Sequence, residues 1–259
     1  MKVYEYGLEN EKTMLMFQPS VEPSWIMFPA AEVMSRDFHV YLAAAEGHNP
    51  EEPGTFTTVE KYAGDAVRYL KERGVTQLDT LYGISMGGST AMYLLAAQLI
   101  PVKKAVIDGG VTPYSYPLVI RKLIAVRDLA FIRLTTKHES IARIIMPPER
   151  WTPAGEDPDE FYHRLFSFLS GPDYTAKTIY NTAWSTNNWS FSEPLPKIDT
   201  EIEFWYGDEE KKERREHIAW AQKHFPQLKQ VEFKDTAHAE MVLVQPERFY
   251  KEAMRFFVD

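Results

Sequence analysis

Short apolar runs alternate with amphipathic stretches along the first part of the chain. The apolar runs are typical of buried strands and cover residues 13–17, 39–45, 78–82 and 104–107. Between them, residues 59–73 and 90–99 carry apolar side chains at helical spacing. Because strands and helices alternate, the pattern predicts an α/β fold with a mostly parallel central sheet and helices on both faces.

The pattern changes in the middle of the chain. Between about residues 113 and 196 it predicts helices and no clear strand, punctuated by prolines. The helices predicted there cover residues 118–134, 140–145, 159–169 and 174–183. Strands are expected again at 201–206 and 229–234, with helices at 212–224 and 246–257. We therefore expect one α/β core, made of residues 1–112 and 197–259, with an all-helical insert at 113–196.

Composition narrows the possible partners. The 259 residues carry a net charge of −8, so no basic excess is available for nucleic acid. The absence of cysteine excludes disulfides and thiol catalysis. No apolar run reaches the length of a membrane span, and the first residues lack the apolar core of a signal peptide. We therefore expect a cytoplasmic protein with no nucleic acid and no membrane among its partners.

The sequence Gly83-Ile84-Ser85-Met86-Gly87 matches the Gly-x-Ser-x-Gly nucleophile elbow. In this motif a sharp turn from strand to helix exposes the serine hydroxyl, and the crowded turn requires very small neighbours. The amino terminus of the following helix directs amides toward developing negative charge. The motif here follows a predicted strand and opens a predicted helix, which is the setting that this chemistry needs.

With this motif and setting, nearly the whole chain resembles an α/β-hydrolase whose helical insert forms a cap. In that family the order along the chain is nucleophile, acid, histidine. His238, in the loop after the last predicted strand, has both the order and the setting of the family's base. His48 resembles a structural histidine of the family. His217 and His224 lie in a predicted helix and are expected at the surface.

The acid of the triad has three candidates. The resemblance implies an acid in the loop after the strand that follows the cap, usually three residues after a glycine such as Gly207, which favours Glu210. Asp208 in the same loop is the second candidate. Asp108 is the third, because some relatives carry the acid at the end of that earlier strand. The mixed-charge run 209–216 is otherwise expected to form a solvated helix face.

The oxyanion hole needs two backbone amides. The resemblance assigns one to Met86, the residue after the nucleophile. The other belongs to the loop after the strand at 13–17, where many relatives have His-Gly and this chain has Gln18-Pro19. By that alignment the resemblance implies that Ser20 supplies the second amide. Pro19 departs from the family's pattern and has no N–H to donate.

These residues predict a serine hydrolase that acts on a small-molecule acyl substrate, with a carboxylesterase as the simplest form. The same triad also serves carbon–carbon bond hydrolysis and acyl transfer in relatives, and a catalytically silent ligand-binding member is a third possibility. The sequence has neither a zinc-protease motif nor a phosphate-binding loop nor a dinucleotide fingerprint. We therefore expect no metal and no cofactor, and we expect cap aromatics to line an apolar pocket over Ser85.

Overall fold

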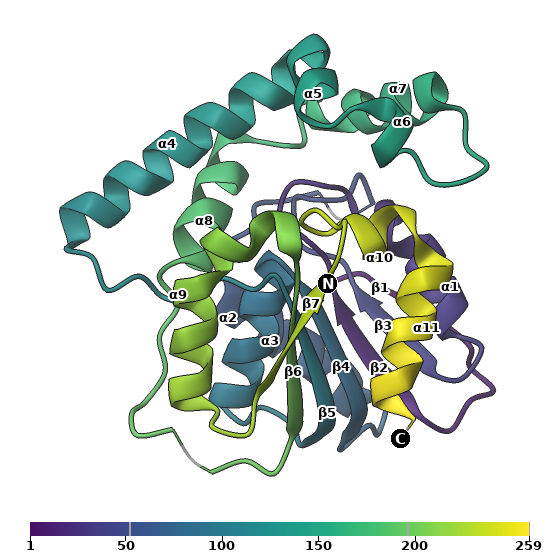
Figure 1. Ribbon diagram of the computed structural model, residues 1–259, viewed down its shortest axis with the longest axis vertical. Helices are drawn as coiled ribbons and strands as arrows, with labels where there is room; N and C mark the ends of the chain where they lie inside the picture. The colour runs from purple at the N-terminus through teal and green to yellow at the C-terminus, as the bar shows by residue number, and fades with distance from the viewer. Residues whose placement is uncertain (52, 196, 259) are drawn as a thin grey trace.

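The computed structural model describes residues 1–51, 53–195 and 197–258. Within these residues a seven-stranded sheet forms the centre of the molecule (Figure 1). Its strands are β1 (Val3–Tyr6), β2 (Thr13–Phe17), β3 (His39–Ala43), β4 (Leu78–Ile84), β5 (Val102–Asp108), β6 (Glu201–Gly207) and β7 (Lys229–Phe233). They pair in the order β1-β3-β2-β4-β5-β6-β7, and only β1 with β3 is antiparallel. The predicted α/β fold class is confirmed.

Helices cover both faces of the sheet. One face carries α2 (Val59–Glu72), α3 (Met86–Ala96) and α9 (Lys211–His224); the other carries α1 (Phe28–Met34), α10 (Glu240–Val244) and α11 (Pro246–Phe257) (Figure 1). Strand β2 explains the two cores, because successive side chains of a strand point to opposite faces. Leu15 and Phe17 join the core under α2 and α3, whereas Met14 and Met16 join the core under α1 and α11.

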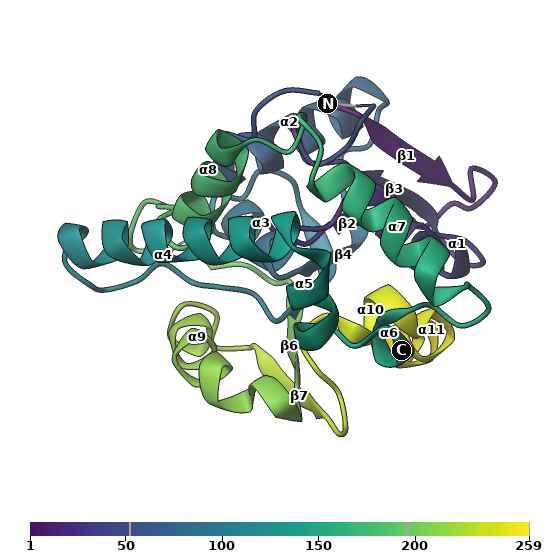
Figure 2. The same cartoon turned by 90° about the horizontal axis from the view of Figure 1, so that it is seen from above.

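The helical insert lies between β5 and β6. It contains α4 (Leu118–Lys137), α5 (Glu139–Ile145), α6 (Pro148–Trp151), α7 (Pro158–Leu169) and α8 (Ala176–Thr186). The described part of this segment has no strand. The helices α4 to α7 form a layer above one end of the sheet (Figures 1 and 2). The expected boundary at residue 196 lies outside the described residues, so the division into core and cap stays a prediction.

Three elements of the core have no counterpart in the prediction. Strand β1 is an edge strand of four residues, and only Val3 is buried in it, so its apolar pattern is weak. Helix α1 is short and preceded by a single 3₁₀ turn, Ser24–Met27. Helix α10 has five residues and is buried throughout, which removes the polar face that marks a surface helix. No helix in the described ranges is long and apolar enough to cross a membrane.

Phe249 anchors α11 to the sheet beneath the end of β4. Its side chain is fully buried, and its ring lies 4.8 Å from the ring of Tyr82. Phe249→Ala is expected to lower the free energy of unfolding by about 3–5 kcal/mol, because it removes buried area and leaves a cavity. Urea unfolding measures this change. The matched control is Phe131→Ala on an exposed ring, which should cost less than about 0.5 kcal/mol; similar losses for the two variants would contradict the packing described here.

Candidate active site

The Gly-x-Ser-x-Gly motif forms the turn between β4 and α3. Ser85 adopts φ 56° and ψ −115°, a backbone conformation that is strained for any residue with a side chain. A Cβ atom on Gly83 would lie 2.1 Å from the carbonyl oxygen of Gly87, and one on Gly87 would lie 2.3 Å from that of Phe17. Only glycine fits these two positions. The Ser85 N–H donates to the Asp108 carbonyl at 2.8 Å, which fixes the turn beside the end of β5.

His238 lies beside the same strand end, in the loop between β7 and α10. A Cβ atom on Gly109 would lie 2.6 Å from Cε1 and Nδ1 of His238, so the imidazole packs directly on the backbone that follows Asp108. Nδ1 of His238 lies 2.7 Å from Oε2 of Glu210. The neighbouring strands β4 to β7 thus place the Ser85 turn and the Glu210–His238 pair at the same carboxyl ends, where open α/β sheets bind ligands.

Glu210 also forms an ion pair with Arg214. The Glu210 side chain is 8% exposed, and Nε of Arg214 donates to its Oε2 at 2.6 Å. The Gly207 N–H donates to Oε1. Burial alone would raise the pKa of Glu210, but the hydrogen bonds and charges of His238 and Arg214 lower it to about 2. The expectation that the run 209–216 is a solvated face is therefore wrong for Glu210 and Arg214. Their spacing of four residues is the feature of the sequence that indicates an ion pair on one side of a helix.

The other two candidate acids have different partners. Asp208 Oδ1 accepts from the Thr236 N–H at 3.3 Å. Asp108 Oδ2 accepts from the Tyr82 hydroxyl at 2.6 Å. Burial raises the pKa of Asp108 to about 7, against the opposing effect of the Tyr82 hydrogen bond. Among the described residues, Glu210 is the carboxylate within hydrogen-bonding distance of the candidate imidazole.

Gln18 holds the loop that follows β2. Its side chain is fully buried, with Oε1 accepting from the Ala45 N–H at 3.0 Å and from Ser24 Oγ at 2.5 Å. Its Nε2 donates to the Glu22 carbonyl at 3.0 Å. The loop also runs against the start of α3, because a Cβ atom on Gly87 would lie 2.7 Å from the Gln18 carbonyl oxygen. The amide side chain therefore fixes this loop internally where many relatives have a histidine.

The Ser20 carbonyl, in the loop after β2, contacts side chains from the loop after β3 and from the helical insert. It lies 2.6 Å from Nε2 of His48, and it accepts from the Tyr174 hydroxyl of the helical insert at 3.3 Å. Since a carbonyl oxygen can only accept, Nε2 of His48 carries a proton. Burial lowers the pKa of His48 to about 4 and keeps the ring neutral.

Met86, the other expected oxyanion donor, is the first residue of α3.

His217 is not a surface residue, so that prediction is wrong. It lies on the face of α9 that turns inward, and its Nδ1 accepts from the Thr112 N–H at 3.2 Å. Burial lowers its pKa to about 4. His224 is half-buried and stacks on Trp220 with ring centroids 4.0 Å apart. Neither histidine has a hydrogen bond to Glu210 among the described residues, although the charges of Arg214 and Glu210 also act on His217.

Arg150, on α6 of the insert, connects the two loops that carry Glu210 and His238. Its Nη2 lies 2.6 Å from Oε1 of Glu209, and its Nε donates to Oε1 of Glu240 at 3.0 Å. Glu240 in turn accepts from the backbone N–H of residue 237 at 2.8 Å. The sequence carries no sign of this bridge, because nothing in the spacing along the chain pairs position 150 with 209 or 240.

Glu22 is a further carboxyl group, in the loop that follows β2. Its Oε2 accepts from the Val21 N–H at 3.3 Å. Burial raises its pKa, while the charge of His238 acts in the opposite direction, so the two side chains lie within electrostatic reach. A single glutamate in a loop gives no sequence signal of such a setting.

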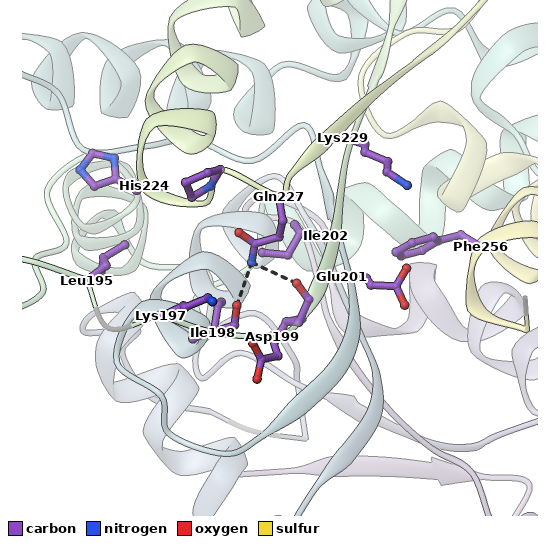
Figure 3. A pocket seen from close by; sticks show the side chains of 12 residues that line it. Leu195, Lys197, Ile198, Asp199, Glu201, Ile202, His224, Gln227, Lys229 and Phe256 are labelled. Atoms are coloured by element: carbon purple, nitrogen blue, oxygen red, sulfur yellow. Dashed lines mark hydrogen bonds between the residues drawn. The ribbon is translucent and has the colours of Figure 1, made fainter.

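A separate hollow of about 740 Å³ lies at the opposite end of β6 from Glu210. Leu195, Ile198, His224 and Gln227 line it, and Gln227 donates to the Ile198 carbonyl (Figure 3). Its lining contains no serine to act as a nucleophile beside a histidine. The Ser85 turn and the Glu210–His238 pair lie at the other end of the sheet.

Comparison with known proteins identifies the family. Residues 20–252 match the model of the Alpha/beta hydrolase family. The chain therefore belongs to the α/β-hydrolase family, as its resemblance indicated. No match to this chain was found among curated proteins.

Solved structures agree with this fold over the full length. An α/β-hydrolase family protein from Desulfitobacterium hafniense is 17% identical, with a TM-score of 0.73 and 100% of both chains covered. A serine hydrolase from Cycloclasticus zankles is 15% identical, with a TM-score of 0.72, covering 99% of this chain and 93% of the other. A marine microorganism esterase is 19% identical, with a TM-score of 0.65 and 98% of each chain covered. At these identities the likeness establishes the fold.

The buried ion pair at Glu210 predicts a pH-dependent contribution to stability. The folded pKa of Glu210, about 2, lies below its ordinary value of 4.5. The ionised carboxylate therefore stabilises the folded state fully above about pH 4.5 and loses this effect as the pH falls toward about 2. Glu210→Gln should lower the free energy of unfolding more at about pH 6 than at about pH 3, measured by urea unfolding.

The matched control is Glu9→Gln, at an exposed glutamate in the turn between β1 and β2. This variant should change stability by the same small amount at both pH values. A Glu210→Gln effect that does not depend on pH would show that Glu210 is not held as a carboxylate by His238 and Arg214.

Proposed function

We propose that the chain is a serine hydrolase that cleaves a carboxylic ester or a related acyl compound through an acyl-enzyme on Ser85. The observation that carries this proposal is the 2.7 Å contact between Glu210 and His238 beside the strained turn at Ser85. A base that is oriented by a buried carboxylate, next to a serine in a nucleophile elbow, is the arrangement that acyl transfer needs.

In this mechanism His238 Nε2 takes the proton of the Ser85 hydroxyl while Oγ attacks the substrate carbonyl carbon. Glu210 accepts a hydrogen bond from Nδ1–H, which fixes the imidazole tautomer and stabilises the imidazolium. His238 then gives the proton to the leaving alcohol, and the acyl group remains on Ser85. Water, activated by the same imidazole, releases the carboxylic acid and restores the serine.

The tetrahedral oxyanion would be bound by the backbone amides of Met86 and Ser20. The amino terminus of α3 favours negative charge at Met86. The Ser20 assignment is supported by the loop contacts of Gln18 and by the two hydrogen-bond donors, His48 and Tyr174, at the Ser20 carbonyl. These contacts hold the loop in one conformation, which is what a preformed oxyanion hole requires.

Names of the similar structures agree with this reaction class. One is described as a serine hydrolase and another as an esterase. We therefore favour simple carboxylic esters as the first substrates to test, and an apolar acyl pocket formed by aromatic residues of the helical cap.

Ser85→Ala is expected to abolish both labelling by a fluorophosphonate probe and hydrolysis of p-nitrophenyl esters of graded chain length. Loss of the nucleophile should reduce kcat by about 10⁶-fold, which leaves only the residual rate that substrate binding and oxyanion stabilisation support. The control is Ser140→Ala at an exposed serine, which should label and turn over like the wild type. A wild type that does not label, or a Ser85→Ala variant that labels equally, would remove the proposal.

Replacing each candidate carboxylate by its amide tests which residue is the acid of the proposed triad. Glu210→Gln should lower kcat by about 10⁴-fold, because the amide favours the wrong imidazole tautomer. Asp208→Asn, in the same loop, should lower it by less than about tenfold, since Asp208 bonds only to the neighbouring loop. Steady-state kinetics on one ester measure both variants. The reverse ranking would assign the acid to Asp208.

A further inference from the structure

Helix α4 exposes an apolar stripe on the side that faces away from the protein. Its buried residues, Ala125 and Thr136, lie on the face that packs toward α8. A different face carries Val119, Leu123, Val126, Ala130 and Leu134, spaced three or four residues apart and all exposed. This spacing aligns them along one side of the helix. We call these five residues the α4 stripe.

The α4 stripe is part of a concentrated apolar surface. Within the described residues twelve large hydrophobic side chains are exposed, and nine of them lie on α4 or the adjoining α5. Leu123 is 64% exposed and Ile144 on α5 is 79% exposed. Scattered exposed hydrophobic residues are ordinary, whereas a concentration of them indicates a surface that binds a partner.

Basic side chains border the α4 stripe. In helical projection Lys122 and Arg133 lie along one side of it, and both are exposed. Arg127 lies on the other side, among the exposed Ile120 and Phe131, and its Nη2 pairs with Asp128 at 2.7 Å. Helix α4 has five basic residues and one acidic residue, in a chain whose net charge is −8. The electrostatic character of this helix is therefore opposite to that of the rest of the protein.

The two simplest partners for this surface are a second copy of the chain and a lipid membrane, and the charge of α4 distinguishes between them. A symmetric dimer formed through the α4 stripe would bring the basic borders of two copies against each other, which costs free energy. An anionic lipid surface offers the complementary pair of features, namely an apolar layer and negative headgroups. Helices with apolar and basic residues in this arrangement lie in the plane of such an interface.

We propose that the α4 stripe and its basic border dock this protein onto anionic phospholipid membranes. Helix α4 lies at the outer surface of the layer above the sheet, with no other element over it in either view (Figures 1 and 2). The expectation of no membrane partner rested on the lack of a spanning segment, and an interfacial helix needs none. Docking through α4 turns the end of the sheet that carries Ser85 toward the lipid.

Co-sedimentation of the full chain with lipid vesicles tests the proposal. Vesicles of phosphatidylcholine and phosphatidylglycerol at a roughly 2:1 ratio should bind the protein, whereas pure phosphatidylcholine should bind it far more weakly. Lys122→Glu/Arg133→Glu should weaken binding by at least about 30-fold, from about fivefold per basic residue near an anionic surface. Leu123→Ser/Val126→Ser should also abolish sedimentation. Ser85→Ala should bind like the wild type, which separates this test from the proposed hydrolysis.

Two matched controls separate the surface from general effects. Lys71→Glu/Lys251→Glu changes the net charge equally at exposed sites on α2 and α11, and Leu8→Ser removes an exposed leucine from the turn between β1 and β2. Both should bind like the wild type. The proposal is overturned by a wild type that does not sediment, or by controls that lose binding equally. It is also overturned if light scattering finds a wild-type dimer that Leu123→Ser/Val126→Ser disperses.

Discussion

The strained turn at Ser85 is the constraint on which the rest of the site depends. The backbone of Ser85 can hold φ 56° only because the neighbouring chain closes around it. Gly83 and Gly87 leave no room for a Cβ atom, so β4, α3 and the loop after β2 meet at backbone distance. The same closeness brings the Ser85 amide onto the Asp108 carbonyl and thereby sets the turn beside the strand end on which His238 packs. Strain at one residue is thus maintained by contacts from three elements.

The helical insert contacts this arrangement through polar side chains at two points. Arg150 reaches the loops that carry Glu210 and His238, through Glu209 and Glu240. Tyr174 reaches the Ser20 carbonyl on the other side of the site. Ion pairs of this kind weaken when one partner moves by a few ångströms, because the Coulomb energy falls with distance and water enters. The insert therefore does more than cover the strand ends, since its position and the geometry of both loops depend on each other.

Sequence reasoning predicted the parts of the fold whose pattern is local. The strands at Thr13–Phe17 and Glu201–Gly207 are apolar runs, and Gly83 to Gly87 is a motif whose steric reason lies within five residues. The resemblance to the family placed the candidate histidine in the loop after the last strand, and that assignment stays a prediction. What could not be predicted depends on contacts between distant segments: the inward face of His217, and the edge strand β1, which gains its partner only in the folded sheet. The charge pattern predicted a solvated side chain for Arg214, which is wrong. The sequence of a mixed-charge helix start is the same whether its side chains face solvent or fold over a neighbouring loop.

Three carboxyl groups feel the charge of His238, and their surroundings drive their pKa values apart. The contact with His238 and then that with Arg214 lower the pKa of Glu210 to about 2 despite burial. Asp108 and Glu22 have no ion pair within the described ranges; burial raises the pKa of Asp108 to about 7 and also raises that of Glu22. In the proposed mechanism, three full negative charges around His238 would repel one another and hold its imidazolium too tightly to return the proton. That outcome is avoided when Glu210 is ionised while Asp108 and Glu22 keep their protons more readily. Different pKa values allow carboxyl groups in one site to have different roles.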